Sequence, residues 1–340
     1  MTANAHPAEV TILRELLAAR NGYVSGAKLA RLLGISRVAV WMHMGKLRRQ
    51  GFAFEAVRSR GYRLHHIPAE PHPALILAHL HGRGRPARLL CLATVDSTNA
   101  EAERQLAAGC PLPCVIFARE QTLGRGRLGR RWHSAPNGSL YVSFAFRPHL
   151  EPAHMQDFTL WMGLNLCDLV ANFCNLTPGI KWPNDLLIEG RKAGGMLTEA
   201  RVDADQIRDI VFGLGLNVNV APSDLPRDLQ RTATSLAHAT GRSFDLNRFA
   251  AALVGRILTS YHQFIDGSYT DKFARLWKRY DILRGQRVSL TQGQHTISGI
   301  AAGIDAEGSL ILRLDNGRTD RFRSGEVSLA KNQPPGAEPE

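Results

Sequence analysis

The sequence predicts a multidomain α+β protein with a helical head, a central α/β domain and a small β-rich domain near its C-terminal end. Three observations lead to this fold class. Basic residues are concentrated at the start of the chain, strand and helix patterns alternate through the middle, and short strands with glycine-containing turns fill the last part. The 340 residues exceed what one ordinary hydrophobic core supports, so two or three domains are expected.

The bulk composition is that of a soluble globular protein, with 44% hydrophobic and 21% charged residues. No stretch of about 18 apolar residues is present, and the first residues lack the basic-then-apolar pattern of a secretory signal. We therefore expect a cytoplasmic protein without a membrane partner. The five cysteines lie outside any CxxC pair, which favours reduced thiols that pack in the core.

The head, residues 1–66, holds 11 Lys and Arg against 3 Asp and Glu, so it carries +8 of the total formal charge of +12. Apolar residues at helical spacing predict helices over residues 10–20, 25–33 and 36–50. Ser25 and Ser36 are suited to cap the second and third helices, and Gly34 to end the second. Two strand-like runs, 52–57 and 62–64, flank a basic turn. This pattern predicts a winged helix-turn-helix.

Such heads place their third helix in the major groove of DNA, while basic residues on its flanks and on the wing contact phosphates. The candidate DNA-binding residues are Ser36, Arg37, Trp41, Met42, Lys46, Arg58 and Arg60. A small helical domain that recruits a protein partner is the alternative. A linker over residues 67–86 is predicted from its prolines, with a short helix near 74–81. Its neighbouring histidines, 65, 66, 72, 79 and 81, lack the spacing of metal ligands and are expected in solvent.

The central domain, residues 87–283, is predicted to contain a mixed, largely antiparallel sheet. Strands are expected at 89–95, 114–119, 139–147, 196–202 and 207–220, and helices at 100–108, 156–173, 247–265 and 270–283. The C-terminal domain, residues 284–330, has strand patterns at 288–290, 296–304, 309–314 and 319–322. Their even spacing predicts a small SH3-like β-barrel. Residues 331–340 are rich in Pro and Gly and are expected to be disordered.

The most informative motif is the glycine–arginine segment Glu120–Trp132, which contains Gly124-Arg125-Gly126-Arg127. Glycines let the backbone approach a ligand closely, and arginines between them match carboxylate and phosphate oxygens. The segment is neither a Walker A loop nor a GxGxxG turn. Taken alone, it also fits a flexible RNA-binding loop, and a second GRGR at Gly82–Arg85 lies in the predicted linker.

Four further motifs supply context. They are Asp96-Ser97-Thr98-Asn99, Lys181-Trp182-Pro183-Asn184-Asp185, Lys192-Ala193-Gly194-Gly195-Met196 and Gly213-Leu214-Gly215-Leu216-Asn217-Val218-Asn219. Each is explainable as a cap, a turn or a core strand. Together, and in this order with the C-terminal Gly325-Glu326-Val327-Ser328-Leu329, they resemble the biotin–protein ligases, in the bifunctional form that is also a biotin-operon repressor. The resemblance covers nearly the whole chain.

This resemblance implies a two-step reaction in which biotin and ATP, with Mg²⁺, form biotinyl-5'-AMP, and a lysine of a biotin carboxyl carrier protein then accepts the biotin. The carrier implied is that of acetyl-CoA carboxylase. The other implied partners are operator DNA and a second copy of the chain when the adenylate is bound. No metal site formed by the protein alone is expected, since Mg²⁺ arrives with ATP.

The resemblance also implies roles for residues. Arg127 would bridge carboxylate and phosphate, Lys192 would act on the biotin carbonyl, and Asp185 would orient or deprotonate the incoming lysine. Trp132 would pack on adenine. The residues expected to hold biotin and the adenylate are Ser97, Thr98, Asn99, Gln121, Arg125, Gly126, Arg127, Trp132, Lys192, Gly195 and Asn217.

Departures from the family pattern are few. Leu128 and Met42 stand where basic residues are frequent, and Gly45 costs about 1 kcal/mol inside a helix. Two other functions stay open: a small-molecule sensor that has lost catalysis, and a lipoate ligase. The presence of Arg127 and Lys192 favours a ligase over a sensor.

Overall fold

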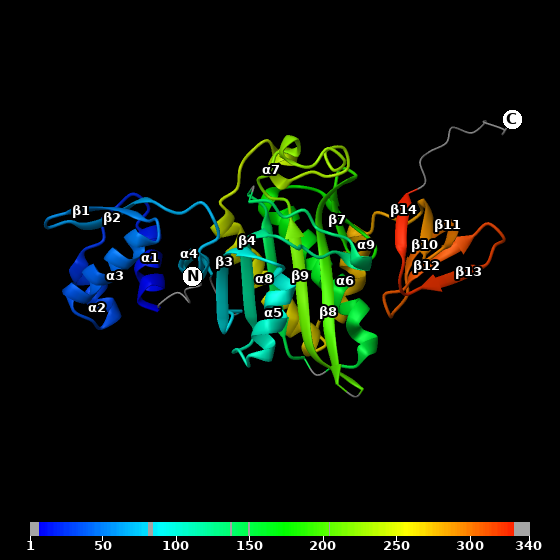
Figure 1. Cartoon of the computed structure of the whole chain (residues 1–340), viewed down its shortest axis with the longest axis horizontal. Helices are drawn as coiled ribbons and strands as arrows, with labels where there is room; N and C mark the ends of the chain where they lie inside the picture. Colours follow the sequence, from blue (N-terminus) through cyan, green and yellow to red (C-terminus); the bar gives the residue numbers. More distant parts are fainter. Residues whose placement is uncertain (1–6, 81–83, 137, 149, 204, 330–340) are drawn as a thin grey trace.

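The computed structural model describes residues 7–80, 84–136, 138–148, 150–203 and 205–329. Figure 1 shows the head, the central sheet and the C-terminal sheet following one another along the long axis of the molecule. His81, part of the second GRGR segment and the predicted tail 331–340 lie outside the described residues.

The head has the predicted arrangement of three helices and a two-stranded wing. Its elements are α1 (Pro7–Ala18), α2 (Gly26–Leu33), α3 (Arg37–Arg49), β1 (Ala53–Val57) and β2 (Gly61–His66). Ser25 and Ser36 cap α2 and α3 by accepting hydrogen bonds from the backbone N–H groups of Lys28 and Ala39. Gly34 ends α2 in a left-handed conformation, with φ of 64°. The predicted capping residues are therefore confirmed.

The segment predicted as a linker contains a buried helix, α4 (Pro73–His79), and is more than a spacer. Ala74 and Leu75 pack into the core of the head, while Ile76 and Leu80 belong to the core of the central domain. Contacts of α4 with α1 and with α8 (Leu246–Ile265) hold the two cores together. The short helix expected within the linker is therefore a packed element, because apolar side chains on different sides of α4 enter two different cores.

Asn247, at the start of α8, attaches the chain before α4 to the central domain. Its side chain is 1% exposed. Its Oδ1 accepts a hydrogen bond from the backbone N–H of His72 at 2.7 Å, and its Nδ2 donates to the carbonyls of Pro68 and Glu70 at 3.1 and 3.0 Å. The prediction that His72 lies in solvent is wrong, because this side chain is half-buried. Its Nδ1 accepts from the N–H of Ala74, and burial lowers its pKa to about 4.

The central sheet has the strand order β3-β4-β5-β9-β8-β7-β6. Its strands are β3 (Arg88–Val95), β4 (Cys114–Gln121), β5 (Leu140–Phe146), β6 (Pro178–Lys181), β7 (Asp185–Ile188), β8 (Arg191–Asp203) and β9 (Gln206–Leu216). Among the described strands of this sheet, β3 and β4 form the single parallel pair, so the predicted mixed, largely antiparallel sheet is confirmed. The strand β6 was not expected from the sequence, because four residues are too few for a periodic signal.

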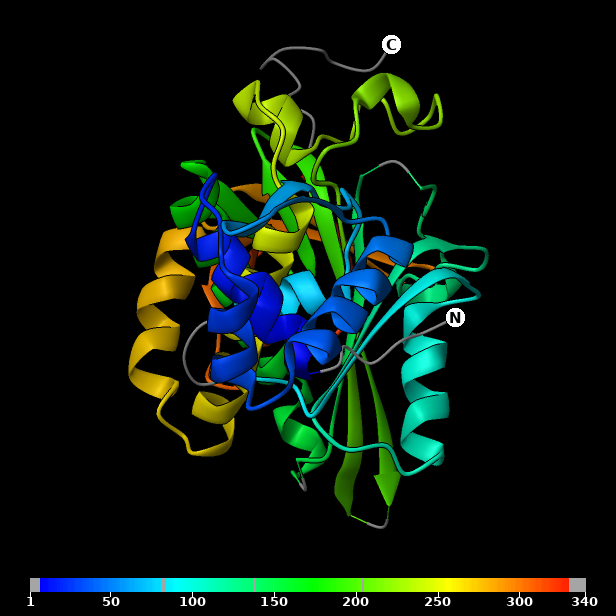
Figure 2. The same cartoon turned by 90° about the vertical axis from the view of Figure 1, so that its left-hand side faces the viewer.

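Helices cover both faces of this sheet (Figure 2). They are α5 (Thr98–Ala107) on one face, and α6 (Met155–Cys174), α8 and α9 (Thr270–Tyr280) on the other, with a short α7 (Leu236–Thr240) beyond the strands. Alternate residues of each strand point to opposite faces. Ile116 therefore packs in the small cluster under α5, while Val115 and Phe117 enter the main core under α6.

The C-terminal domain is a five-stranded antiparallel sheet in the order β13-β12-β11-β10-β14. Its strands are β10 (Arg287–Gln292), β11 (His295–Ile304), β12 (Leu310–Leu314), β13 (Thr319–Phe322) and β14 (Glu326–Leu329). The indole Nε1 of Trp182 donates a hydrogen bond to the carbonyl of Gly308 at 3.0 Å, which ties this sheet to the central domain. Within the described residues, no helix has both the length and the apolar character that crossing a membrane requires.

Candidate active site

Glycines on two adjacent strands form an open floor on the face of the sheet that carries α5. Gly195 on β8 lies opposite Gly215 on β9, and Gly213 lies two residues before Gly215 on the same face. A Cβ atom at Gly215 would lie 2.4 Å from the ring of Trp132, and one at Gly213 would lie 2.1 Å from Asn99 Oδ1. Side chains at Gly215 and Gly213 would therefore displace Trp132 and Asn99.

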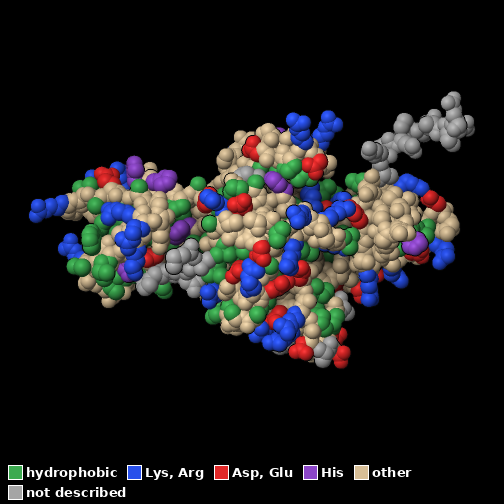
Figure 3. All heavy atoms as spheres, in the orientation of Figure 1, with side chains coloured by type: hydrophobic (Ala, Val, Ile, Leu, Met, Phe, Trp, Pro, Cys, Tyr) green, Lys and Arg blue, Asp and Glu red, His purple; other side chains and the backbone are tan. Residues whose placement is uncertain are grey.

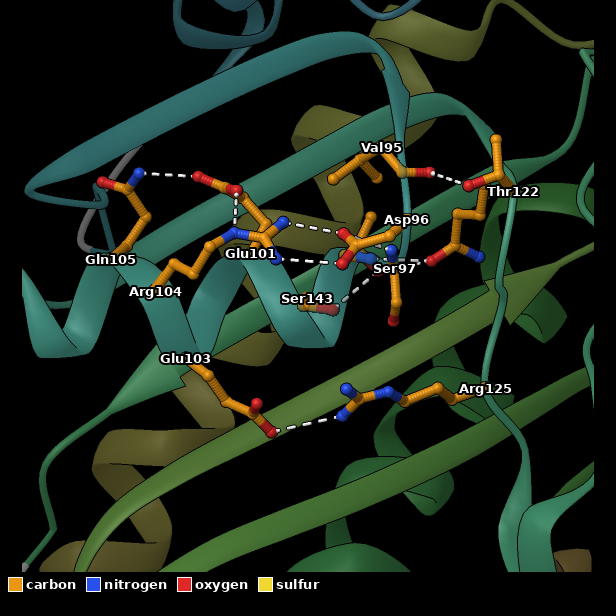
Figure 4. A network of polar contacts seen from close by, with 12 residues as sticks. Val95, Asp96, Ser97, Glu101, Glu103, Arg104, Gln105, Thr122, Arg125 and Ser143 are labelled. Carbon is orange, nitrogen blue, oxygen red and sulfur yellow. Dashed lines mark hydrogen bonds and ion pairs between the residues drawn. The ribbon is translucent and has the colours of Figure 1, made fainter.

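The motif Asp96–Asn99 lies where β3 ends and α5 begins. Asp96 accepts the backbone N–H of Ser97 at 2.8 Å and forms two hydrogen bonds with Arg104, which lower its pKa to about 2 (Figure 4). Ser97 precedes α5 without making a capping hydrogen bond through its side chain. Its hydroxyl is buried and lines the cavity, as expected for a residue that binds a ligand rather than a helix end.

A chain of buried polar contacts continues from this motif. The backbone N–H and the hydroxyl of Thr98 lie 2.8 and 3.1 Å from Gln121 Oε1, and Ser143 Oγ lies 2.8 Å from Thr98 Oγ1 and 2.6 Å from Asn99 Oδ1. The hydroxyl groups of Thr98 and Ser143 supply two protons for these three oxygen–oxygen contacts, so one acceptor position is left without a proton. The floor is therefore rich in hydrogen-bond acceptors and suits a ligand with N–H groups.

The glycine–arginine segment forms a narrow hairpin above this floor. The N–H groups of Gly126 and Trp132 donate to the carbonyls of Arg130 and Gly124, at 2.7 and 2.9 Å. Leu128, at its tip, is 74% exposed with φ of 55°. Leu128 is nevertheless among the residues that line the cavity, so the departure from the family pattern leaves an uncharged side chain at an exposed part of the lining.

Two cationic groups lie at one side of the cavity. Arg127 Nη1 donates to Asn184 Oδ1 at 3.3 Å, and desolvation by burial lowers the pKa of Arg127. Lys192 Nζ lies 2.7 Å from Asp185 Oδ1 and 5.3 Å from the centre of the Trp132 ring. The sequence separates Arg127 from Lys192 by 65 positions, but the fold brings both to one cavity. Arg127 and Lys192 would therefore both attract an anionic ligand to this cavity.

One cavity, partly open to solvent, brings most of the predicted residues together. Of the predicted catalytic and ligand-binding residues, those that line it are Ser97, Thr98, Asn99, Gln121, Arg125, Gly126, Arg127, Trp132, Asp185, Lys192 and Gly195. The structure does not place Asn217 with them. That side chain is buried and donates to the carbonyl of Thr234 at 3.0 Å, so it supports a loop.

Sequence reasoning missed several polar residues around the cavity. Ser143 is fully buried in the apolar strand β5, and Asn184 holds Arg127 while its own Nδ2 donates to the carbonyl of Met196 at 2.7 Å. Glu326 of the C-terminal sheet lines the cavity and pairs with Arg130 of the hairpin. A lone serine inside an apolar strand was the signal at Ser143. Asn184 and Glu326 stand in motifs that carried the resemblance, but sequence reasoning assigned them no role.

The head presents the other predicted site. Arg37, Trp41 and Arg58 line one groove between α3 and the wing, and Trp41 is 61% exposed. Met42 and Lys46 are exposed on α3, whereas the Ser36 hydroxyl is used as a cap. The structure does not bring Arg60 into this groove: its guanidinium lies 4.1 Å from the centre of the Tyr23 ring. Lys and Arg side chains are prominent on the visible face of the head (Figure 3).

Comparison with known proteins places each part of the chain. Residues 92–217 match the biotin/lipoate A/B protein ligase family, residues 9–63 match an HTH domain, and residues 284–330 match the biotin protein ligase C-terminal domain. The chain is 33% identical to the bifunctional ligase/repressor BirA of Bacillus subtilis, over 92% of this chain and 95% of that protein. It is 32% identical to the biotin–[acetyl-CoA-carboxylase] ligase of Mycobacterium tuberculosis, over 69% of this chain and 86% of that protein.

A solved structure leads to the same family. The biotin protein ligase of Aquifex aeolicus, in complex with biotin and ATP, matches 71% of this chain and 98% of its own, with 28% sequence identity and a TM-score of 0.61. An acceptor-rich floor, two convergent cations and a basic head thus occur in a chain whose three parts all match one kind of protein. The chain belongs to the biotin protein ligases, in the bifunctional form that joins the ligase to an N-terminal DNA-binding domain.

Proposed function

We propose that the protein activates biotin with ATP to form biotinyl-5'-AMP and transfers the biotin to a lysine of a biotin carboxyl carrier protein, that of acetyl-CoA carboxylase. The observation that carries this proposal is the combination of an acceptor-rich floor with Arg127 and Lys192 in one cavity. The ureido N–H groups of biotin would meet the acceptors. Its carboxylate would then extend toward the cations.

In the first step, a carboxylate oxygen of biotin attacks the α-phosphorus of ATP, and pyrophosphate leaves. The two reactants repel each other, and fixed cations hold them at reacting distance. Arg127 bridges carboxylate and phosphate, Lys192 stabilises the negative oxygens, and Trp132 packs against adenine. Mg²⁺ is expected to accompany ATP, where it would neutralise charge on the phosphates.

In the second step, the amine of the carrier lysine attacks the acyl carbon, AMP leaves, and the amine loses a proton. Asp185 is the carboxylate proposed to orient this amine or take its proton. Its ion pair with Lys192 keeps it near the acyl group. The hairpin over the floor would shield the mixed anhydride from water.

The head would bind operator DNA and make the protein a biotin-responsive repressor in the cytoplasm. The groove lined by Arg37, Trp41 and Arg58 supports this, because it joins α3 to the wing. Binding should weaken steeply with salt, with a log–log slope of roughly −0.9 for each neutralised phosphate. The SH3-like barrel expected from the strand spacing and the dimerisation of the adenylate-bound form implied by the family resemblance remain predictions.

The deciding experiment measures transfer of labelled biotin to a purified carrier domain in the presence of Mg·ATP. We expect transfer by the wild type. The Lys192→Gln variant should be slower by about a hundredfold, because it loses one preorganised donor. Lys278→Gln, at an exposed position of α9, is the matched control. Biotin-dependent DNA binding without transfer would identify a sensor, and transfer of lipoate instead of biotin would identify a lipoate ligase.

A further inference from the structure

Glu199 on β8 connects two parts of the site that the proposed chemistry uses separately. It lies on the same face of the sheet as Gly195 and opposite Val211 of β9. Its Oε2 accepts a hydrogen bond from Asn99 Nδ2 at 2.6 Å, and its Oε1 lies 3.3 Å from Arg125 Nη1 of the hairpin. Glu199 is not among the residues that line the cavity and lies in an adjoining hollow beside the hairpin, so within the cavity it acts through these two neighbours.

The first contact fixes the orientation of the Asn99 amide. A carboxylate only accepts hydrogen bonds, so Asn99 must turn its NH₂ group toward Glu199. Its Oδ1 then faces Ser143 Oγ at 2.6 Å. An amide side chain has nearly the same shape in either orientation, and its partners decide which one is adopted. The carbonyl of Leu197, 3.4 Å from Asn99 Nδ2, favours the same orientation through a longer contact. A neutral apolar residue at position 199 would therefore weaken this preference at the floor of the site.

The second contact, between Glu199 and Arg125, belongs to a circuit of polar contacts that starts at Arg125 of the hairpin and returns to the hairpin at Trp132. Arg125 is also held by Glu103 of α5 at 3.4 Å (Figure 4). At the other end, Gln121 Nε2 donates to Ser134 Oγ at 2.8 Å, and Ser134 Oγ donates to the carbonyl of Trp132 at 3.1 Å. In order, the circuit runs through Arg125, Glu199, Asn99, Ser143, Thr98, Gln121, Ser134 and Trp132.

We infer that Glu199 is a positioning residue with two separable roles: one carboxylate oxygen orients Asn99 for the ligand head, and the other holds Arg125 so that the hairpin stays closed over the activated ligand. The inference rests on the proposed function and deepens it. Because one carboxylate serves both contacts, a ligand that orders the floor also favours the closed hairpin. Neither role requires Glu199 to touch the substrate.

Three variants separate these roles. Glu199→Leu removes both contacts. Glu199→Gln keeps an oxygen for Asn99 Nδ2 but places an uncharged amide near Arg125. Glu103→Gln weakens the hold on Arg125 without changing the floor, so it is the matched control for the hairpin role. The measurements are the KM for biotin, kcat, and the release rate of preformed biotinyl-adenylate after a chase with unlabelled biotin and ATP.

We expect Glu199→Leu to raise the KM for biotin by about tenfold, the size of one lost hydrogen bond to a charged group, with a much smaller change in kcat. Glu199→Gln should keep the wild-type KM but release the adenylate several times faster, and Glu103→Gln should do the same to a smaller extent. A purely structural role would instead lower the active fraction of the protein and leave KM unchanged.

The inference is overturned when an active wild type is matched by a Glu199→Leu variant of equal KM, or when Glu199→Gln releases the adenylate at the wild-type rate. The isosteric Glu199→Gln variant decides the second role even if Glu199→Leu fails to fold. An inactive wild type would instead refute the proposed function. That outcome is visible in the same assay before any variant is compared.

Discussion

Replacing Asn247 by alanine tests how firmly the head is attached to the central domain. The substitution leaves three backbone groups of the segment 68–72 without their partner: the N–H of His72 and the carbonyls of Pro68 and Glu70. Each hydrogen bond contributes about 1 kcal/mol, and an unsatisfied buried group costs a similar amount or more. Because the Asn247 side chain is 1% exposed, we expect a loss of about 3 kcal/mol in the free energy of unfolding.

Urea unfolding gives this free energy, and hydrogen exchange of residues 68–72 locates the change. Asn172→Ala is the control, because that exposed side chain also donates to a backbone carbonyl, of Asp168 in its own helix, and should cost far less. DNA affinity of Asn247→Ala should fall while biotin transfer at low temperature stays near the wild-type rate. A loss below about 1 kcal/mol with unchanged exchange would refute the view that Asn247 fastens the head.

Three further predictions concern the cavity and the segment before α4. Arg127→Gly should release bound adenylate faster by about tenfold, since one charged contact is removed; retention of labelled adenylate on a filter measures this. Gly215→Ala should raise the KM for ATP more than that for biotin, because its Cβ would lie 2.4 Å from the Trp132 ring and push the indole away. His72 has a folded-state pKa near 4, below its ordinary 6.5, so the unfolded chain takes up the proton first as pH falls. His72 therefore lowers wild-type stability by up to about 1.4 kcal/mol per pH unit between pH 6.5 and 4, and His72→Asn should lack that slope in unfolding experiments across this range.

Local patterns in the sequence determined much of this protein. The capping serines Ser25 and Ser36 and the turn at Gly34 depend on side chains within three residues, so the helices of the head could be predicted closely. The alternation of Gly213 and Gly215 has the period of a strand, which placed both glycines on one face. Motif order then indicated the family and most of the cavity lining.

Long-range partners could not be predicted in this way. Glu199 follows Asn99 by 100 residues. Their hydrogen bond forms because α5, which carries Asn99, covers the face of β8 and β9 to which Glu199 points. Asn217 belongs to a motif shared with the family, but its side chain turns toward Thr234 and away from the cavity. A side chain's direction depends on the register of its strand and on what packs beside it, and neither is written in the motif itself.

The segment before the central domain shows the same division. Its prolines and histidines suggested a linker, and its short helix was expected near the observed position. The sequence could not show that α4 contributes Leu75 to one core and Ile76 to another, because two adjacent apolar residues look alike whichever core they enter. Composition and local spacing determined which elements form and which chemistry they carry. The packing of distant elements decided which polar groups meet, because hydrogen bonds and burial depend on distance in space rather than along the chain.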